Sequence, residues 1–101
     1  MLVRHKNARL ARLETDASYT ADGAFSPSVI RGFRKVMGWI RNGHDERDLR
    51  NLKSLHYEKL EGKRAQQRSM RINDQWRLIE EWEGKGATKT VVIVAIEDYH
   101  R

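Results

Sequence analysis

The sequence predicts an α+β domain in which N-terminal helices pack on one face of a small, mainly antiparallel sheet. Apolar residues recur at helical spacing in the first half of the chain and alternate at strand spacing after residue 66. An unbroken, mostly β-branched run lies at 90–96, close to the end. Helices followed by a meander of strands indicate an α+β fold and not alternating βαβ units.

Length and composition restrict the possible classes of protein. The 101 residues suffice for one domain, 1–101, with a modest core. Twenty Lys and Arg against fourteen Asp and Glu give a formal charge of +6 and a pI near 10. This surplus favours a polyanionic partner, nucleic acid before membrane, although a merely basic surface is the alternative at this point.

Cellular location can be predicted from three absences in the sequence. There is no cysteine, which excludes disulfides and thiolate metal sites. The first sixteen residues lack a signal-peptide core, and no apolar run reaches membrane-spanning length. We therefore expect a cytoplasmic protein with no membrane partner.

The first predicted elements lie in residues 2–25. Residues 2–3 either begin a short edge strand or lead directly into a helix. Residues 7–14 place two leucines one helical turn apart, which predicts a helix. The stretch 15–25 contains Asp, Ser and Gly and is predicted to be a loop.

The clearest helix begins after Ser26, a suitable N-cap, with Pro27 at the first helical position. Asn42 and Gly43 end it. One face is basic and is typical of a solvated surface: Arg31, Arg34, Lys35 and Arg41. The other face, together with two valines near the end of the chain, is expected to be core: Val29, Phe33, Val36, Met37, Ile40, Val92 and Val94.

A shorter helix is predicted after Asp45, another suitable N-cap. Leucines spaced by three residues would turn inward: Leu49, Leu52 and Leu55. The hydrophobic period then changes near Tyr57, and strand-like segments follow.

A hairpin is predicted from the strands 67–72 and 76–82. Because side chains alternate along a strand, a three-residue turn sets Met70 across from Leu78 and makes one face apolar. A two-residue turn would set Met70 opposite Arg77 instead. The hydrophobic pattern therefore selects the longer turn.

The opposite face of this hairpin carries Arg71 beside Arg77. Adjacent arginines repel each other and persist most easily where the face meets an anion, of which phosphate is the commonest. The alternative is a solvated face with both guanidiniums in water. After a turn at 83–88, the run 90–96 is predicted to be the central strand of the sheet.

Polar residues follow that strand and are expected at the rim of the sheet, where functional groups often lie. Metal-free RNA cleavage needs a base for the ribose 2′-hydroxyl, a cation for the phosphate and an acid for the departing 5′ oxygen. The rim and the arginine face can supply all three through Asp98, Tyr99, His100, Arg71 and Arg77. The alternatives are that Tyr99 only packs, Asp98 pairs with an arginine, and His100 is disordered.

Three motifs of the last half of the chain resemble a known family: Gly62-x-Arg64, SMRINDQWRL at 69–78, and EDYH at 97–100. They are similar to the RelE/ParE superfamily of type II toxin–antitoxin toxins, and most closely to its HigB branch of plasmid-maintenance killer proteins. The resemblance implies a RelE-like fold and a metal-independent, ribosome-dependent mRNA endonuclease (mRNA interferase). It also implies as partners messenger RNA, the ribosome and a cognate antitoxin, a HigA-like helix-turn-helix protein.

The resemblance also implies roles for individual residues. The tail Asp98, Tyr99 and His100 would act with strand arginines Arg71 and Arg77. His56 resembles the family's upstream histidine, although two extra residues separate it from Gly62; the alternative is an exposed loop histidine. RNA phosphates are expected at Lys59, Arg64 and Arg68. No histidine pair has metal-ligand spacing, so neither a metal nor another cofactor is expected.

The rival hypothesis is a toxin without catalysis. The ParE branch shares the fold and poisons DNA gyrase by protein contact, and a fold does not determine a function. The tail separates the two hypotheses, because Tyr99 and His100 beside paired arginines serve a nuclease and have no obvious use in a gyrase inhibitor.

Overall fold

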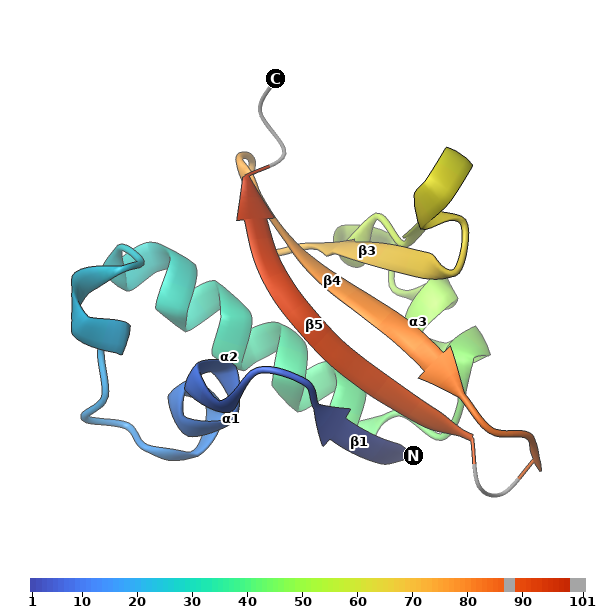
Figure 1. Cartoon of the computed structure of the whole chain (residues 1–101), viewed down its shortest axis with the longest axis horizontal. Helices are drawn as coiled ribbons and strands as arrows, with labels where there is room; N and C mark the ends of the chain where they lie inside the picture. Colours follow the sequence, from blue (N-terminus) through green and yellow to red (C-terminus); the bar gives the residue numbers. More distant parts are fainter. Residues whose placement is uncertain (87–88, 99–101) are drawn as a thin grey trace.

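The computed structural model describes residues 1–86 and 89–98. It contains a five-stranded sheet with the order β1-β5-β4-β3-β2, in which β1 and β5 run parallel and the other neighbours antiparallel (Figure 1). The helices and strands are α1 (Ala8–Thr15), α2 (Pro27–Asn42), α3 (Glu46–Asn51), β1 (Leu2–His5), β2 (Glu58–Lys59), β3 (Gln67–Arg71), β4 (Trp76–Glu83) and β5 (Thr90–Asp98). Short 3₁₀ turns are η1 (Ala21–Gly23), η2 (Lys53–Leu55) and η3 (Gly62–Arg64). The predicted α+β architecture is confirmed, and residues 2–3 belong to an edge strand.

A side-chain cap starts each of the three helices: Ser26 and Asp45 as predicted, and Asn7, which was not predicted to be a cap. The Asn7 side chain accepts hydrogen bonds from the backbone amides of Arg9 and Leu10. At the start of α3, the Asp45 side chain accepts from the backbone amides of Arg47 and Asp48. The Ser26 hydroxyl accepts from the backbone amide of Val29 at 3.3 Å. These side chains satisfy amides that a helix start leaves without an intrahelical partner.

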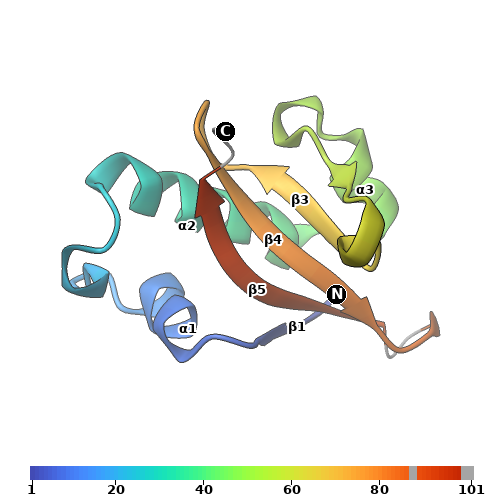
Figure 2. The ribbon, with the colours of Figure 1, turned by 45° about the horizontal axis from the view of Figure 1, so that its top comes forward.

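Helix α2 runs behind β4 and β5 and buries its apolar stripe against them (Figures 1 and 2). Phe33 and Ile40 on α2 are completely buried, as are Met70 and Leu78 on the sheet. The helix approaches the β3–β4 turn so closely that a Cβ at Gly32 would lie 2.7 Å from Cγ2 of Ile72. Glycine is therefore the residue that permits this packing.

The basic face of α2 is only partly solvated, which corrects the sequence interpretation. Arg34 turns back onto the loop that precedes the helix. Its guanidinium donates hydrogen bonds to the main-chain oxygens of Leu13 at 2.9 Å, Asp16 at 3.0 Å and Tyr19 at 3.3 Å. Arg34 thus ties α2 to the end of α1 and to the loop that follows it through three main-chain oxygens.

The β3–β4 hairpin has the predicted register. Met70 lies opposite Leu78, and Arg71 lies opposite Arg77. The amide of Ile72 donates to the oxygen of Trp76 at 2.9 Å, which leaves three residues in the turn. The loop-parity argument is confirmed.

The position of β5 differs from the prediction. β5 lies between β1 and β4, so the middle strand of the sheet is β4. A bulge at Ile79/Glu80 shifts the pairing by one residue and reverses which β5 side chains face the helices. Val91 and Ile93 therefore join the helix-side core, Val92 is buried outside that cluster, and Val94 is partly exposed, so its prediction as core was wrong.

The described part of the chain contains no helix whose length and apolar character would let it cross a bilayer.

Candidate functional site

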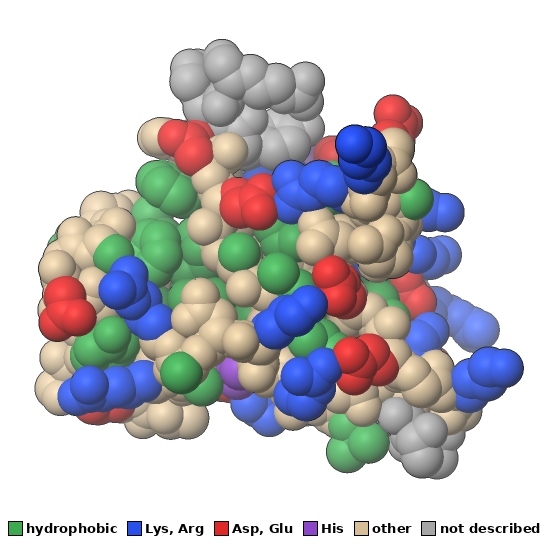
Figure 3. Space-filling view, in the orientation of Figure 1, with side chains coloured by type: hydrophobic (Ala, Val, Ile, Leu, Met, Phe, Trp, Pro, Cys, Tyr) green, Lys and Arg blue, Asp and Glu red, His purple; other side chains and the backbone are tan. Residues whose placement is uncertain are grey.

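A hollow of about 210 Å³ lies on the sheet where β3, β4 and β5 meet the segment after β2. Ser69, Arg77 and Glu97 line it from three neighbouring strands. Figure 3 looks onto this side of the sheet and shows basic and acidic side chains interleaved over the strands. The complete lining is Leu60, Arg64, Ser69, Arg77, Ile79, Glu97 and Asp98.

Arg77 is the most deeply held cation of this hollow. Only 5% of the residue is exposed. Its Nη2 donates to the main-chain oxygen of His56 at 2.6 Å and to the Ser69 hydroxyl at 2.9 Å, and it lies 3.9 Å from a carboxylate oxygen of Glu58. A guanidinium stays protonated when buried, so these contacts fix a permanent positive charge in the wall of the hollow.

The burial of Arg77 corrects the sequence interpretation of the arginine pair. Arg71 lies directly across from it, as predicted, but makes an ion pair with Asp74 in the adjacent turn. Arg71 does not line the hollow and instead borders a separate groove beside α2. Two adjacent arginines coexist because each has its own protein partners, and neither splays freely into water.

Arg64 and Glu97 form the polar rim of the hollow. Arg64 Nη2 donates to both carboxylate oxygens of Glu97 at 2.9 Å, and its Nε donates to Gln67 at 2.8 Å. In the register of β4 and β5, Glu97 lies directly opposite Arg77. Arg64 had been predicted to bind RNA, whereas Glu97 was missed as a site residue. Alternation along β5 was the signal that could have identified it, because it places Glu97 on the Arg77 row.

Asp98 lies at the end of β5 and lines the hollow. Its carboxylate accepts a hydrogen bond from the side-chain amide nitrogen of Gln75 at 3.0 Å. Tyr99 and His100, the two residues predicted to follow it in the site, lie outside the described residues. The structure therefore brings Asp98 and Arg77 to the same hollow and leaves the roles of Tyr99 and His100 as predictions.

His56 meets the site through its backbone. It has a left-handed conformation with φ of 44°, a region in which histidine is enriched among non-glycine residues. Its carbonyl oxygen accepts the bond from Arg77, and the residue is exposed. It does not line the hollow, so its predicted catalytic role stays a prediction.

Lys59 and Arg68 were predicted to bind RNA, but they lie on the other face of the sheet edge. They pair with each other across β2 and β3, whereas Glu58 pairs with Ser69 of the hollow. Because successive side chains alternate faces, Lys59 and Arg68 are directed away from Arg77. Of the three predicted RNA-binding residues, only Arg64 lines the hollow with Arg77.

Within residues 1–86 and 89–98, no three His, Asp or Glu side chains are grouped as metal ligands. The chemistry available to the described hollow is that of fixed guanidiniums and carboxylates. Such groups can stabilise negative charge and transfer protons.

Comparison with known proteins assigns this chain to a family. Residues 6–100 match the model of the HigB-like toxins, described as RelE-like toxins of type II toxin–antitoxin systems. A solved structure of a YoeB/ParE toxin from Agrobacterium tumefaciens is 18% identical and superposes with a TM-score of 0.59, covering 99% of this chain and 100% of that one. At this identity the likeness shows a shared fold, and no curated protein matches the chain. The family match spans nearly the whole sequence: the chain belongs to the HigB-like toxins, RelE-like toxins of type II toxin–antitoxin systems, and therefore has a cognate antitoxin as its partner.

Proposed function

We propose that this toxin is a metal-independent endoribonuclease that cuts messenger RNA, using the hollow around Arg77 as its active site. The observation that supports the proposal most directly is the buried Arg77, fixed by Ser69 and the His56 carbonyl in the wall of a hollow at the strand ends. A fixed cation of this kind can stabilise charge that develops on a phosphate in the transition state.

The proposed reaction is attack of the ribose 2′-oxygen on the adjacent phosphorus. The 2′ O–H loses its proton to a base, the new P–O bond forms, and the bond to the departing 5′ oxygen breaks as an acid protonates that oxygen. Arg77, with Arg71 as its cross-strand neighbour, would stabilise the phosphate charge. Asp98, Tyr99, His100 and His56 are the proposed proton-transfer groups, and the products are a 2′,3′-cyclic phosphate and a 5′-hydroxyl.

Ribosome dependence and the nature of the antitoxin are further parts of the proposal. The formal charge of +6 suits binding to ribosomal and messenger RNA, and such binding weakens with added salt. By analogy with the family, we propose that the toxin cuts messenger RNA in the cytoplasm while it is being translated. We propose a HigA-like helix-turn-helix protein as its antitoxin.

Cleavage in a translating extract tests the proposal. Purified toxin is added to the extract, and the ends of the message are mapped with wild-type protein and with Arg77→Ala. We expect new ends carrying a cyclic phosphate or 3′-phosphate with the wild type alone. A message with 2′-deoxyribose at the scissile position should stay intact, because it lacks the attacking group; cleavage of that message at the normal rate would overturn the mechanism.

A gyrase-directed toxin without catalysis is the second candidate. The similar solved structure carries ParE in its description, and the Arg64–Glu97 pair across the hollow would be equally compatible with a surface that is not catalytic. Inhibition of DNA supercoiling by purified gyrase, together with intact messages in the translating extract, would favour this candidate.

A further inference from the structure

A second basic hollow lies on the opposite face of the β2 edge from the candidate active site. It measures about 340 Å³ and is lined by Arg50, Tyr57, Lys59 and Arg68. Three of these four side chains are cationic, and no carboxylate is among them. Figure 3 shows Lys and Arg side chains gathered along the right-hand border of the molecule, where Figure 1 places α3 and β3.

The register of β2 explains why the two hollows lie close together on opposite faces. Lys59 pairs with Arg68 on one face, and Glu58 pairs with Ser69 on the other. Ser69 lines the candidate active site, and Lys59 and Arg68 line the second hollow. Because β2 is the last strand of the sheet and contains two residues, a short edge separates the hollows.

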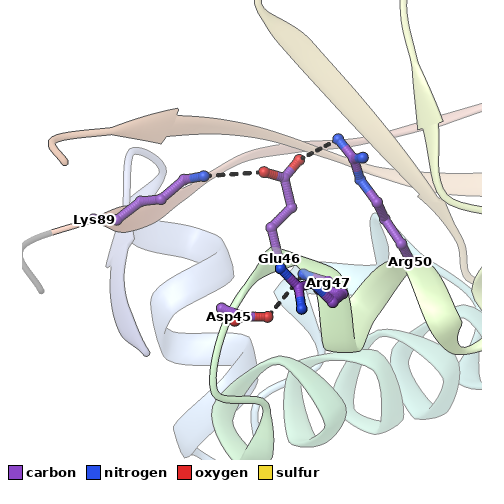
Figure 4. Close-up of a pocket in the computed structure, with 5 residues that line it drawn as sticks. All are labelled: Asp45, Glu46, Arg47, Arg50 and Lys89. Atoms are coloured by element: carbon purple, nitrogen blue, oxygen red, sulfur yellow. Dashed lines mark hydrogen bonds and ion pairs between the residues drawn. The ribbon is translucent and has the colours of Figure 1, made fainter. Parts of the chain in front are cut away.

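A half-buried carboxylate, that of Glu46, contacts several cations of this region. Glu46 accepts hydrogen bonds from Lys89 at 3.0 Å and from Arg50 at 3.3 Å (Figure 4). Its second oxygen, which accepts from Arg50, also lies 3.8 Å from Nε of Arg68 and accepts from the Tyr57 hydroxyl. One carboxylate thus orients two of the three cations of the hollow, Arg50 and Arg68, so the group keeps surplus positive charge and these two side chains lose less entropy on binding an anion.

Two further features maintain this arrangement. The Arg50 guanidinium lies 5.7 Å from the centre of the Tyr57 ring, within the range of a cation–π contact. Burial raises the pKa of the nearby Glu80 carboxyl, which favours its uncharged form and leaves the local positive charge less compensated. Apart from the Tyr57 ring, the lining offers an entering protein segment little apolar surface, so an acidic peptide is the weaker candidate.

We propose that the second hollow binds an RNA backbone phosphate other than the scissile one, so that the RNA strand crosses the β2 edge between the two hollows. This inference rests on the proposed ribonuclease function. The phosphate comes either from the cleaved message or from ribosomal RNA, and both sources present the same ligand to Arg50, Lys59 and Arg68.

Salt-dependent RNA binding tests the inference. The probe is a twelve-nucleotide RNA with 2′-O-methyl groups throughout, which the proposed mechanism cannot cut, and affinity is measured by fluorescence anisotropy at several KCl concentrations. If the phosphate belongs to the message, Arg50→Gln is expected to lower the slope of log affinity against log salt for this probe by about 0.7, the change for one lost phosphate contact on a single strand. Arg50→Lys should recover most of the slope, because a cation is retained.

Arg9→Gln is the matched control, because Arg9 is an exposed arginine of α1 and its loss changes the net charge equally. Circular dichroism should show all variants folded, since 60% of the Arg50 side chain is exposed. If the phosphate belongs to the message, Arg50→Gln weakens the twelve-nucleotide probe but not a dinucleotide that spans only the scissile bond. If it belongs to ribosomal RNA, Arg50→Gln weakens binding to message-free ribosomes and leaves both oligonucleotides unaffected.

Three results separate this inference from the function on which it rests. Equal effects of Arg50→Gln and Arg9→Gln on every RNA and on ribosomes would overturn the second phosphate site. Weaker binding of Arg50→Gln to the antitoxin, with RNA and ribosome binding unchanged, would assign the hollow to a protein partner and also overturn it. An Arg50-dependent salt slope in a protein that cuts no RNA would support the phosphate site while the ribonuclease assignment fails.

Discussion

The guanidinium of Arg77 donates a 2.6 Å hydrogen bond to the main-chain oxygen of His56, which lies 21 residues earlier in the chain. This bond ties the segment between η2 and β2 to the middle strand of the sheet. The same side chain lines the hollow that we propose as the active site. We therefore expect both the cleavage activity and the stability of the fold to depend on Arg77.

Replacing Arg77 with Ala should lower cleavage by roughly 100- to 1000-fold, the usual loss when one aligned charge-stabilising donor is removed. It should also destabilise the fold by about 1–3 kcal/mol, because the Ser69 hydroxyl and the His56 carbonyl lose a buried partner. Single-turnover cleavage and urea unfolding measure the two effects separately. Arg77→Lys should restore charge but only part of the rate, since an ammonium lacks the planar fork.

Arg71→Ala provides the comparison for Arg77. Arg71 is more exposed and pairs with Asp74, so its loss should change stability less than the loss of Arg77. Equal cleavage by Arg77→Ala and the wild type, with the variant shown to be folded, would remove Arg77 from the mechanism.

The glycines of α2 give a matched pair of stability predictions. At Gly32 a Cβ would lie 2.7 Å from the Ile72 side chain and 2.9 Å from its main-chain oxygen, and the backbone contact cannot be relieved by a rotamer change. Gly32→Ala should therefore cost about 1–3 kcal/mol from overpacking. At Gly38 a Cβ would meet nothing within 4 Å, so Gly38→Ala should stabilise the helix by about 0.5–1 kcal/mol.

Thermal unfolding checks this pair, and the signs of the two shifts are the decisive result. A rise in Tm for Gly32→Ala equal to that of Gly38→Ala would show that the β3–β4 turn can move away from α2. Helix propensity alone predicts two equal rises.

The sequence predicted local structure where a residue type or a parity rule had one physical solution. Ser26 and Pro27 indicated the start of α2, and the alternation around Met70 required a three-residue turn; both predictions are confirmed. The bulge at Ile79/Glu80 has no comparable signal, because it depends on how β4 and β5 twist together. Its effect on Val94 therefore could not be predicted.

The site was predictable in composition and less so in geometry. Arg64, Arg77 and Asp98 were identified from motifs, and all three line one hollow. The burial of Arg77 depends on the His56 segment, and the direction of Lys59 depends on the register of β2. Both depend on contacts between residues far apart in the sequence, and local hydrophobic periodicity carries no information about such contacts.

Glu97→Gln should strengthen RNA binding with little change in stability. In the Arg64–Glu97 ion pair, 46% of the Arg64 side chain and 42% of the Glu97 side chain are exposed. Exposed ion pairs contribute only about 0–1 kcal/mol to the free energy of unfolding. Removing the carboxylate charge leaves Arg64 more available to a phosphate in the hollow. Binding of non-cleavable RNA measures the gain, and weaker binding by Glu97→Gln would argue against phosphate occupancy of this hollow.

The last prediction concerns Glu80, whose carboxyl is completely buried on β4 and makes no hydrogen bond within the described residues. Burial raises its pKa well above the usual value of 4.5; the charges of Arg68 and Arg77 oppose that shift, and the charge of Glu46 adds to it. Between the two pKa values the folded protein binds more protons than the unfolded chain. The contribution of Glu80 to stability is therefore fully present below pH 4.5 and decreases as the pH rises toward its folded pKa.

Glu80→Gln removes this titration, so the variant should gain stability relative to the wild type as the pH rises from 4.5 toward neutrality. Urea unfolding of both proteins at a series of pH values measures the difference. The carboxylate of Glu14, whose pKa is lowered by its hydrogen bond with Arg41, acts in the opposite sense in both proteins and cancels from the comparison. Glu61→Gln at an exposed position serves as the control and should follow the wild type. A stability difference between Glu80→Gln and the wild type that stays constant over this pH range would show that the Glu80 carboxyl is charged in the folded protein, stabilised by Arg68 and Arg77.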